Sequence, residues 1–519
     1  MTTYDTIPYP SYSYVNTDPA RLGAVARVFG MQSAPLDGAN VLEIGCATGG
    51  NILPMAARYP DATFTGVDLS ENQISTAQEK VKGMGLSNIK LIAASITDIS
   101  FEGQKFDYII AHGVYSWVPS NVQDRILEIC EKHLSDTGIA YISYNTLPGW
   151  NAVKTVRDMM LYHVNKIEVT SNKIVEARNI LKFVAANIKS DKGPHKEQLE
   201  QEISTLQKAE DNYLLHDHLE VINDPCYFHE FMEQASNYNL SYLGDSELQS
   251  MYLGNQTDEA ANALSQLNDV VAQEQYVDFI TNRRFRSTIL CKSGSNLTRK
   301  LSPEILDGMT LVPNFGIQKP LKLDQGEVLE TLTLISLQDG ETQASLSGGI
   351  ACAGYLKLLQ RLPSHHTLES VVQAVSQDLH DTPNDEIKTE ISGIILKLVF
   401  SGIVSLVTET TPCVTIPPKK PAAFISARIE ALTKNLVPNL HHDNVKLSND
   451  QRLAIQYVNG SNTTADIAAE VEKHIEKGEL NLSANGTPMK AGSETLEKYL
   501  PEYVDTLLVF LANKALLVG

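Results

Sequence analysis

The sequence predicts an α/β protein whose first 150 residues form a doubly wound parallel sheet, and three observations support this class. Residues 41–144 alternate short apolar runs with helical patterns, as successive strand-helix units require. The first run ends in a glycine-rich turn, residues 45–50, that opens a helix. The second run ends in Asp68, about 25 residues after Glu43, where nucleoside-binding sheets place an acidic side chain. This pattern places a ligand beside the first turn.

The strands of this sheet follow from the apolar runs. They are expected at about 41–45, 63–68, 88–93, 106–111 and 137–144. Right-handed crossovers bring the loops after the strands to one edge of the sheet. Four loops should therefore converge there, at residues 43–51, 68–70, 94–98 and 111–117.

The first loop lacks the residues that bind phosphate groups. Gly45 and Gly50 have the spacing of a P-loop, but Asn51 stands where a triphosphate site needs Lys followed by Ser or Thr. The second glycine of a dinucleotide loop is missing as well. Glu43 would repel a pyrophosphate but suits a ligand with a sulfonium and an ammonium group, and Asp68 can accept both ribose hydroxyls. The predicted ligand is S-adenosylmethionine, and the alternative is a glycine turn that binds nothing.

The same residues resemble a known family. Glu-x-Gly-Cys-x-x-Gly-x-Asn at 43–51, with Gly-Val-Asp-Leu-Ser at 66–70, is similar to the class I methyltransferases. Residues 144–150 resemble that group's Tyr-Asn-x-x-Pro-Gly-Trp, and residues 275–288 resemble its methyltransferase regulatory domain. The bacterial group with this regulatory domain includes the rickettsial outer-membrane-protein lysine methyltransferases. The resemblance covers roughly residues 4–300.

The resemblance implies a Rossmann-like class I methyltransferase domain and a set of cofactor-binding residues. Asp98 is expected to meet the adenine amino group and Ile96 to pack on the ring, although Asp98 is also a plausible surface cap. The expected cofactor-binding residues are Tyr9, Tyr12, Glu43, Gly45, Cys46, Gly49, Asn51, Asp68, Leu69, Ser95, Ile96, Asp98 and His112.

The N-terminal segment carries four tyrosines around two prolines, ahead of a helix expected from Asp18-Pro19 to about residue 29. The tyrosines fit an anchoring strand packed on the domain. The alternative is a lid over the ligand, which the resemblance favours because residues 8–11 and 18–22 are similar to the family's N-terminal signature.

Catalytic residues are expected after the fourth and fifth strands, beside the methyl group. Methyl transfer is an in-line displacement that needs alignment and a desolvated site rather than a covalent nucleophile. His112 is a candidate to relay the proton of an amine acceptor, Tyr115 to line the site, and Tyr144 and Asn145 to orient the acceptor nitrogen. The alternatives are a histidine that only stabilises the strand end, and a turn that only ends the sheet.

The remaining chain is expected to form three further units: a helical regulatory domain (151–310), a winged-helix-like module (311–416) and a helical or second winged-helix-like module (417–519). A helix predicted over 196–219 places His216 and His218 on different sides, so no metal site is expected. Asp278 is expected to pair with an arginine, and the basic residues 283, 284 and 286 to form an internal salt-bridge seam rather than a docking surface.

Composition limits partners and location. A net charge of −20 argues against general binding of nucleic acid or membrane surfaces. The six cysteines form no Cys-x-x-Cys pair, and no run of about 18 apolar residues occurs. A cytoplasmic protein without membrane insertion is expected.

The function expected from these observations is methyl transfer from S-adenosylmethionine, with a lysine side chain of a protein as the acceptor that the resemblance implies. A methyltransferase acting on a small molecule or on the cell envelope is an alternative with the same donor site. A binding protein that has kept the cofactor fold without turnover is another. The resemblance also makes a homodimer plausible.

Overall fold

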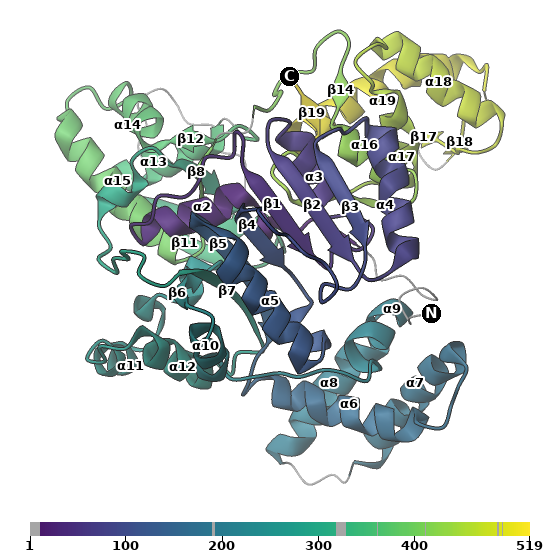
Figure 1. Ribbon diagram of the computed structural model, residues 1–519. Coiled ribbons are helices and arrows are strands. Elements are labelled where there is room, and N and C mark those ends of the chain that lie inside the picture. Colours follow the sequence, from purple (N-terminus) through teal and green to yellow (C-terminus); the bar gives the residue numbers. More distant parts are fainter. Residues whose placement is uncertain are drawn as a thin grey trace.

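The computed structural model describes residues 11–188, 193–317, 329–360, 362–409, 412–484, 487–489 and 491–519. Within these residues the centre of the molecule is a seven-stranded sheet of order β3-β2-β1-β4-β5-β7-β6 (Figure 1). Its parallel part has the strands predicted from the sequence. They are β1 (Asn40–Ile44), β2 (Thr63–Asp68), β3 (Ile89–Ala93), β4 (Phe106–Ala111) and β5 (Leu134–Asn145).

Helices cover both faces of this sheet because successive strand residues point to opposite sides. Val41 packs in one core with residues of α2 (Pro19–Val28), α3 (Ile52–Arg58) and α4 (Glu71–Met84). Leu42 packs in the opposite core with α5 (Ser120–His133) and α10 (Phe228–Ser236). Helix α2 begins where predicted, since Asp18 accepts a hydrogen bond from Ala20 N at 3.1 Å.

Two strands from the segment predicted to be helical complete the same sheet, which corrects the expected boundary at residue 150. These strands are β6 (Leu240–Asp245) and β7 (Phe285–Lys292), and β7 lies antiparallel between β5 and β6. Helices α11 (Asp258–Leu264) and α12 (Val270–Thr281) separate them along the chain. The sequence did not predict β6 and β7 because both strands are short and stand between helical stretches. They therefore do not produce the regular alternation of strands and helices that marks residues 41–144.

The truly helical part of the middle region is a separate unit with its own core (Figure 1). It contains α6 (Trp150–Val164), α7 (Thr170–Asn187) and α8 (Pro194–Lys208). The helix predicted over 196–219 is interrupted, because Ala209 has extended backbone after α8. A short helix, α9 (Asp211–Tyr213), and a π-helical turn (Leu214–His218) follow. That turn buries both His216 and His218, and they belong to a π-helical turn rather than to the regular helix that was predicted.

The predicted salt-bridge seam is confirmed. Arg286 is fully buried, with Nε 2.8 Å from Asp278 Oδ2 and Nη2 3.0 Å from Glu274 Oε2. Arg283 Nη2 lies 3.1 Å from Asp245 Oδ2 on β6. These pairs join α12 to the two strands that close the sheet.

The first C-terminal module surrounds the small sheet β12-β8-β13 and a hairpin-based sheet β11-β10-β9. Three helices and a closing strand follow in this module, and its apolar side chains continue the core under α2. The elements are β8 (Thr310–Pro313), β9 (Phe315–Ile317), β10 (Thr331–Ser336), β11 (Gln343–Ser347), α13 (Gly349–Gln360), β12 (His366–Thr367), α14 (Leu368–Ser376), α15 (Asn384–Phe400) and β13 (Val404–Val407).

The last module has a core of its own and lies above α3 and α4 in Figure 1, with α16 packed against both helices. Two helices, α17 and α18, precede a long helix and a short strand. The elements are β14 (Ala422–Ala423), α16 (Ile425–Ala431), β15 (Leu436–Pro438), β16 (Asn444–Lys446), α17 (Asn449–Ala454), α18 (Thr464–Glu476), β17 (Ser483–Ala484), β18 (Thr487–Pro488), α19 (Glu494–Asn513) and β19 (Leu517–Val518).

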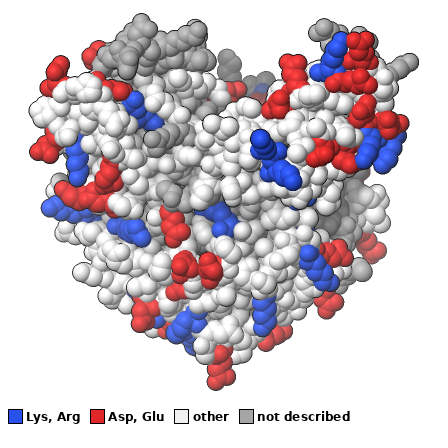
Figure 2. Space-filling model, turned by 90° about the horizontal axis from the view of Figure 1, so that it is seen from above, with Lys and Arg blue, Asp and Glu red and all other residues white. Residues whose placement is uncertain are grey.

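The described residues contain no helix long and apolar enough to cross a bilayer, and no group of three or more potential metal ligands. Among the described residues on the face shown in Figure 2, basic and acidic side chains are interspersed without one continuous patch of either sign. The excess of acidic over basic residues therefore does not form a single acidic patch on this face.

Candidate functional site

The glycine loop between β1 and α3 has the tight shape that its sequence predicts. Gly45 and Gly49 adopt φ values of 78° and 76°, which favour glycine. A Cβ atom on Gly45 would lie 2.4 Å from Val114 Cγ2. The loop therefore passes closely against the loop that follows β4, and only glycine permits that approach.

Glu43, at the end of β1, is a buried carboxyl group with one unsatisfied oxygen. The side chain is 3% exposed, and Oε1 accepts a hydrogen bond from Asn51 Nδ2 at 2.8 Å. Oε2 has no hydrogen-bond partner among the described residues. Burial raises the pKa of Glu43 to about 8. A cationic group placed here would favour the ionised form, so this side chain fits a ligand that carries an ammonium group.

Asp68 is fixed at the end of β2 by two backbone amides. Ala47 N donates to Oδ2 and Ser70 N to Oδ1, each at 2.9 Å. Leu69 beside it is 62% exposed and offers an apolar surface at the same strand end. The carboxylate is therefore oriented by the chain itself, and carboxylate oxygens are the acceptors that ribose hydroxyl groups need.

The third loop and Cys46 differ in the exposure of their side chains. Asp98 is exposed, and its Oδ1 accepts from Thr97 Oγ1 at 3.0 Å, while Ile96 is buried. Ser95 Oγ lies 2.7 Å from Thr97 Oγ1. The Cys46 thiol is buried against Gly66 on β2, where an added Cβ would lie 2.9 Å from Sγ. Cys46 can therefore contribute only backbone atoms to a ligand.

The N-terminal segment lies across the glycine loop and the loop after β4. Gly50 N donates to Ser11 Oγ at 2.8 Å, and Tyr14 N donates to Asn51 Oδ1 at 2.9 Å. The ring of Tyr14 lies 3.9 Å from the ring of His112, measured between centroids. This position favours the lid interpretation. The ring of Tyr12 faces outward to Lys434, 5.3 Å from its Nζ, and Tyr9 lies outside the described residues.

His112 is held through Nδ1 and remains neutral. Nδ1 lies 3.0 Å from Tyr141 Oη, and Tyr141 donates its own proton to Ser287 Oγ. Ser143 Oγ lies 3.2 Å from the same nitrogen. In the tautomer with the proton on Nδ1, the Tyr141 oxygen accepts from Nδ1–H and Nε2 of His112 is the basic nitrogen. Desolvation lowers the pKa of His112 to about 4.

Two of the predicted catalytic tyrosines point away from His112. Tyr115 is 1% exposed, with its hydroxyl 2.5 Å from Gln234 Oε1. Tyr144 is equally buried, stacks on Phe231 at 4.3 Å, and has its hydroxyl 2.9 Å from Thr288 Oγ1. These contacts contradict the predicted catalytic roles. On β5, residues 140, 142 and 144 face the core under α5. Asn145 follows Tyr144 on this strand, so its side chain points to the opposite face of the sheet.

Asn145 remains a candidate. It is 3% exposed, and its buried Nδ2 has no hydrogen-bond partner among the described residues. It pairs across the sheet with Phe285, whose ring lies 6.2 Å from that of His112. The side chains of Tyr14, His112, Phe285 and Asn145 thus gather at one end of the sheet.

The loop 439–443 of the last module also reaches this region. His442 is 1% exposed, and its Nε2 lies 2.8 Å from Asn51 Oδ1. No local pattern could have indicated this contact, because 391 residues separate the two positions.

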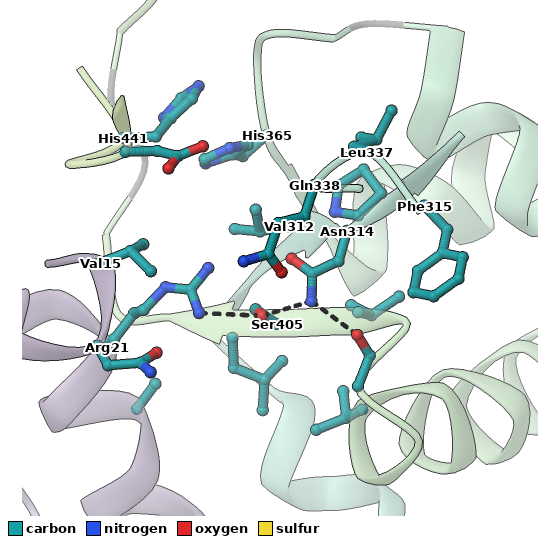
Figure 3. A pocket seen from close by; sticks show the side chains of 18 of the residues that line it. Val15, Arg21, Val312, Asn314, Phe315, Leu337, Gln338, His365, Ser405 and His441 are labelled. Atoms are coloured by element: carbon teal, nitrogen blue, oxygen red, sulfur yellow. Dashed lines mark hydrogen bonds between the residues drawn. The ribbon is translucent and has the colours of Figure 1, made fainter. Parts of the chain in front are cut away.

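A separate cavity of about 480 Å³ lies on the other side of this loop (Figure 3). Arg21 of α2 projects into it and donates to Ser405 Oγ at 3.1 Å, and Asn314 Nδ2 donates to the same oxygen at 2.8 Å. His441 and His365 stack at its edge with centroids 4.0 Å apart. The sequence singled out none of these residues as a site, because they come from three separate units.

Family models match three parts of the chain. Residues 41–138 match a methyltransferase domain, residues 210–292 a predicted methyltransferase regulatory domain, and residues 419–516 the C-terminal winged helix domain of PKMT. The regulatory match spans β6 and β7, so this part of the family model includes strands of the central sheet.

Full-length similarity extends these matches. The uncharacterized protein RP789 of Rickettsia prowazekii is 38% identical over 99% of this chain and 93% of its own length. Two structures of PKMT2 from Rickettsia typhi, one in complex with AdoHcy, align with a TM-score of 0.89 and 31% identity. They cover 98% and 99% of this chain and all of the PKMT2 chain.

Proposed function

This chain belongs to the same family of S-adenosylmethionine-dependent methyltransferases as PKMT2 from Rickettsia typhi, and from that premise we propose that its methyl acceptor is a lysine side chain of a protein. The observation that carries the proposal is the alignment with PKMT2 over the whole length of both chains, beyond the part that holds the donor. A small-molecule enzyme has no need of the regulatory and winged-helix modules that the two chains share.

The donor site fits the cofactor on the chemistry of its own residues. S-adenosylmethionine, when bound, supplies a methyl group on a positively charged sulfur. The unsatisfied oxygen of Glu43 would hold its ammonium group and the Asp68 carboxylate its ribose hydroxyls. Leu69 and Ile96 would provide the apolar walls for the base.

The acceptor end of the site suits an amine. A lysine must enter as the neutral amine, and the ring of Tyr14, which lies against His112, would help to exclude water there, whereas the ring of Phe285 is 41% exposed. The oxygen of the Asn145 amide would accept a hydrogen bond from the amine and aim its lone pair. Nε2 of the neutral His112 would accept the proton that the amine nitrogen loses.

Incubation with a methyl-labelled donor and a cell lysate tests the acceptor. Label in protein bands that acid hydrolysis recovers as methylated lysine supports the proposal. Label confined to the small-molecule or lipid fraction supports the alternative of a small-molecule or cell-envelope methyltransferase. Intact donor binding without any label supports a non-catalytic binding protein. The variant Asp68→Ala, measured in parallel, shows that the label depends on the donor site.

A further inference from the structure

One amide group links the last module to the donor site. Asn51 Oδ1 accepts hydrogen bonds from Tyr14 N at 2.9 Å and His442 Nε2 at 2.8 Å. Thr17 Oγ1 lies 3.0 Å from the same oxygen and shares its one proton with Tyr14 O at 2.8 Å. Its Nδ2 donates to Glu43 Oε1 at 2.8 Å. A backbone N–H can only donate, so the contact with Tyr14 fixes the orientation of the amide. His442 must then carry its proton on Nε2 and donate to Asn51.

This arrangement changes the role predicted for Asn51. The side chain is 2% exposed, and its oxygen is surrounded by Tyr14 N, Thr17 Oγ1 and His442 Nε2. Asn51 therefore acts through its neighbours: it sets the position of the Glu43 carboxyl group and of the N-terminal segment. His442 is the one of its partners that comes from the last module.

A second connection runs through Glu430 on α16. Glu430 is 2% exposed and lies 2.6 Å from Lys80 Nζ and 3.0 Å from Lys434 Nζ. Lys80 also donates to Thr48 O in the glycine loop at 3.3 Å, and Lys434 donates to Ser11 O. One carboxylate of the last module thus orients two lysines, which hold the glycine loop and the N-terminal segment.

A third connection holds the same segment. Asn444 Nδ2 donates to Ser13 O at 2.7 Å, and Ser13 Oγ donates to Asn444 Oδ1 at 3.0 Å. With Lys434 on Ser11, the last module contacts alternate residues of the segment that crosses the glycine loop. Residues 11–14 therefore lie between the donor loop and the last module.

We propose that the C-terminal winged-helix module forms the outer wall of the donor site, and that His442 is a positioning residue which sets donor affinity through Asn51 and Glu43. Donor binding would then require the module to be docked, and any partner that displaced it would lower the affinity for the donor. The inference concerns donor binding alone and does not depend on whether the acceptor is lysine.

The size of the effect follows from the buried hydrogen bond. Loss of one donor to a buried oxygen shifts an equilibrium by roughly fivefold to a hundredfold. Asn51 Oδ1 keeps the Tyr14 N–H as a donor and has Thr17 Oγ1 within hydrogen-bond distance, so the expected loss lies at the low end, at about fivefold to tenfold. The loss should raise the KM for the donor and leave kcat at saturating donor nearly unchanged, because no reacting group is touched.

The test compares His442→Met with His442→Gln in the full-length protein. Both side chains are uncharged and similar in size to histidine, but only glutamine keeps a donor near the position of Nε2. Calorimetry with S-adenosylhomocysteine, which needs no acceptor, is expected to show a Kd about fivefold to tenfold higher for His442→Met. His442→Gln is expected to lie within about twofold of the unaltered protein.

His441→Met is the matched control. His441 is the adjacent residue of the same loop, but its Nε2 lies 2.9 Å from Pro363 O and it borders the other cavity. Unchanged affinity in His441→Met together with the loss in His442→Met supports the proposal. Equal affinities for all three variants, or equal losses in His442→Met and His442→Gln, would overturn it.

A second pair of variants covers the case that His442→Met does not fold. Lys434→Met removes a side chain that is 21% exposed and should weaken binding by a few fold. Lys473→Met on α18, whose ammonium group pairs with Glu470 of the same helix, should leave the Kd unchanged. Identical Kd values for these two variants would contradict the proposed wall, since Lys434 contacts the N-terminal segment directly.

Discussion

Replacing Glu43 with glutamine isolates the charge of the carboxyl group that should meet the donor's ammonium group. Glutamine has the same shape and can still pair with Asn51, so the loop geometry should be preserved. The ligand-free carboxyl group has a pKa of about 8, and at pH 7 it is roughly 90% protonated. Binding of a cation beside Oε2 would ionise it and release about 0.9 proton at this pH.

The sign of the pH dependence follows from this release. Because the bound state holds fewer protons than the free state, donor affinity should increase with pH, by up to about tenfold per unit between pH 6 and pH 8. Above the ligand-free pKa the carboxyl group is already ionised, and the Glu43 contribution should level off. Glu43→Gln should lose this contribution and bind the donor about tenfold to a hundredfold more weakly at pH 8.

Calorimetry in two buffers of different ionisation enthalpy measures the protons released. Protons exchanged by the donor itself appear equally in both proteins, so the difference between unaltered protein and Glu43→Gln belongs to residue 43. Equal proton release by the two proteins would refute the reasoning, because Glu43 would then not ionise on binding.

The pH dependence of the free energy of unfolding, measured without ligand, provides an independent test of the raised pKa of Glu43. The carboxyl group titrates near 4.5 when exposed and near 8 when buried, so the folded state holds the extra proton between these values. Stability should therefore fall as pH rises from about 5 to about 8, by up to about 1.4 kcal/mol per unit. The fall should be smaller in Glu43→Gln, as thermal unfolding without ligand can show.

Four further predictions follow from the contacts around the site. Asp68→Ala should weaken donor binding by at least about tenfold in calorimetry, because a charged acceptor fixed by two backbone amides is lost. His112→Ala should lower kcat by about a hundredfold, while the Kd for the donor changes little. The kcat of the unaltered enzyme should show no titration of His112 between pH 6 and 9, because the pKa of His112 is about 4. Tyr115→Phe should keep kcat within about threefold and reduce stability by about 1 kcal/mol in urea unfolding, because its hydroxyl contacts Gln234 rather than the site; a large loss of kcat would restore the catalytic role. Arg286→Met should destabilise the protein by about 3 to 5 kcal/mol, because Asp278 and Glu274 would remain buried without their partner.

The parts predicted correctly are those in which short stretches of sequence decide the structure. The glycine turn after Glu43, the helix cap at Asp18 and the strand end at Asp68 each depend on a few neighbouring residues. The seam around Arg286 was also expected, since Asp278 and Arg286 lie eight positions apart around one helix end. Local backbone preference and the need to pair a buried charge leave few alternatives at such positions.

The orientation of side chains at the acceptor end was predicted only in part. Tyr144 and Asn145 are neighbours in one motif, but adjacent residues of a strand face opposite sides of the sheet. Tyr144 consequently enters the core with Tyr115 and Phe231, and Asn145 stays beside Phe285. A sequence motif identifies which residues are present, but it does not show on which face of the sheet each side chain lies.

The sequence by itself determined the fold class of the first domain, the identity of the donor and the acidic residues that would hold it, because these depend on loop chemistry within about 30 residues. The tertiary structure decided that β6 and β7 join the same sheet, and that His442 and Glu430 of the last module stand behind the donor loop. Such contacts join positions hundreds of residues apart, and they form only because two cores pack against each other. No local preference in either stretch of chain encodes them.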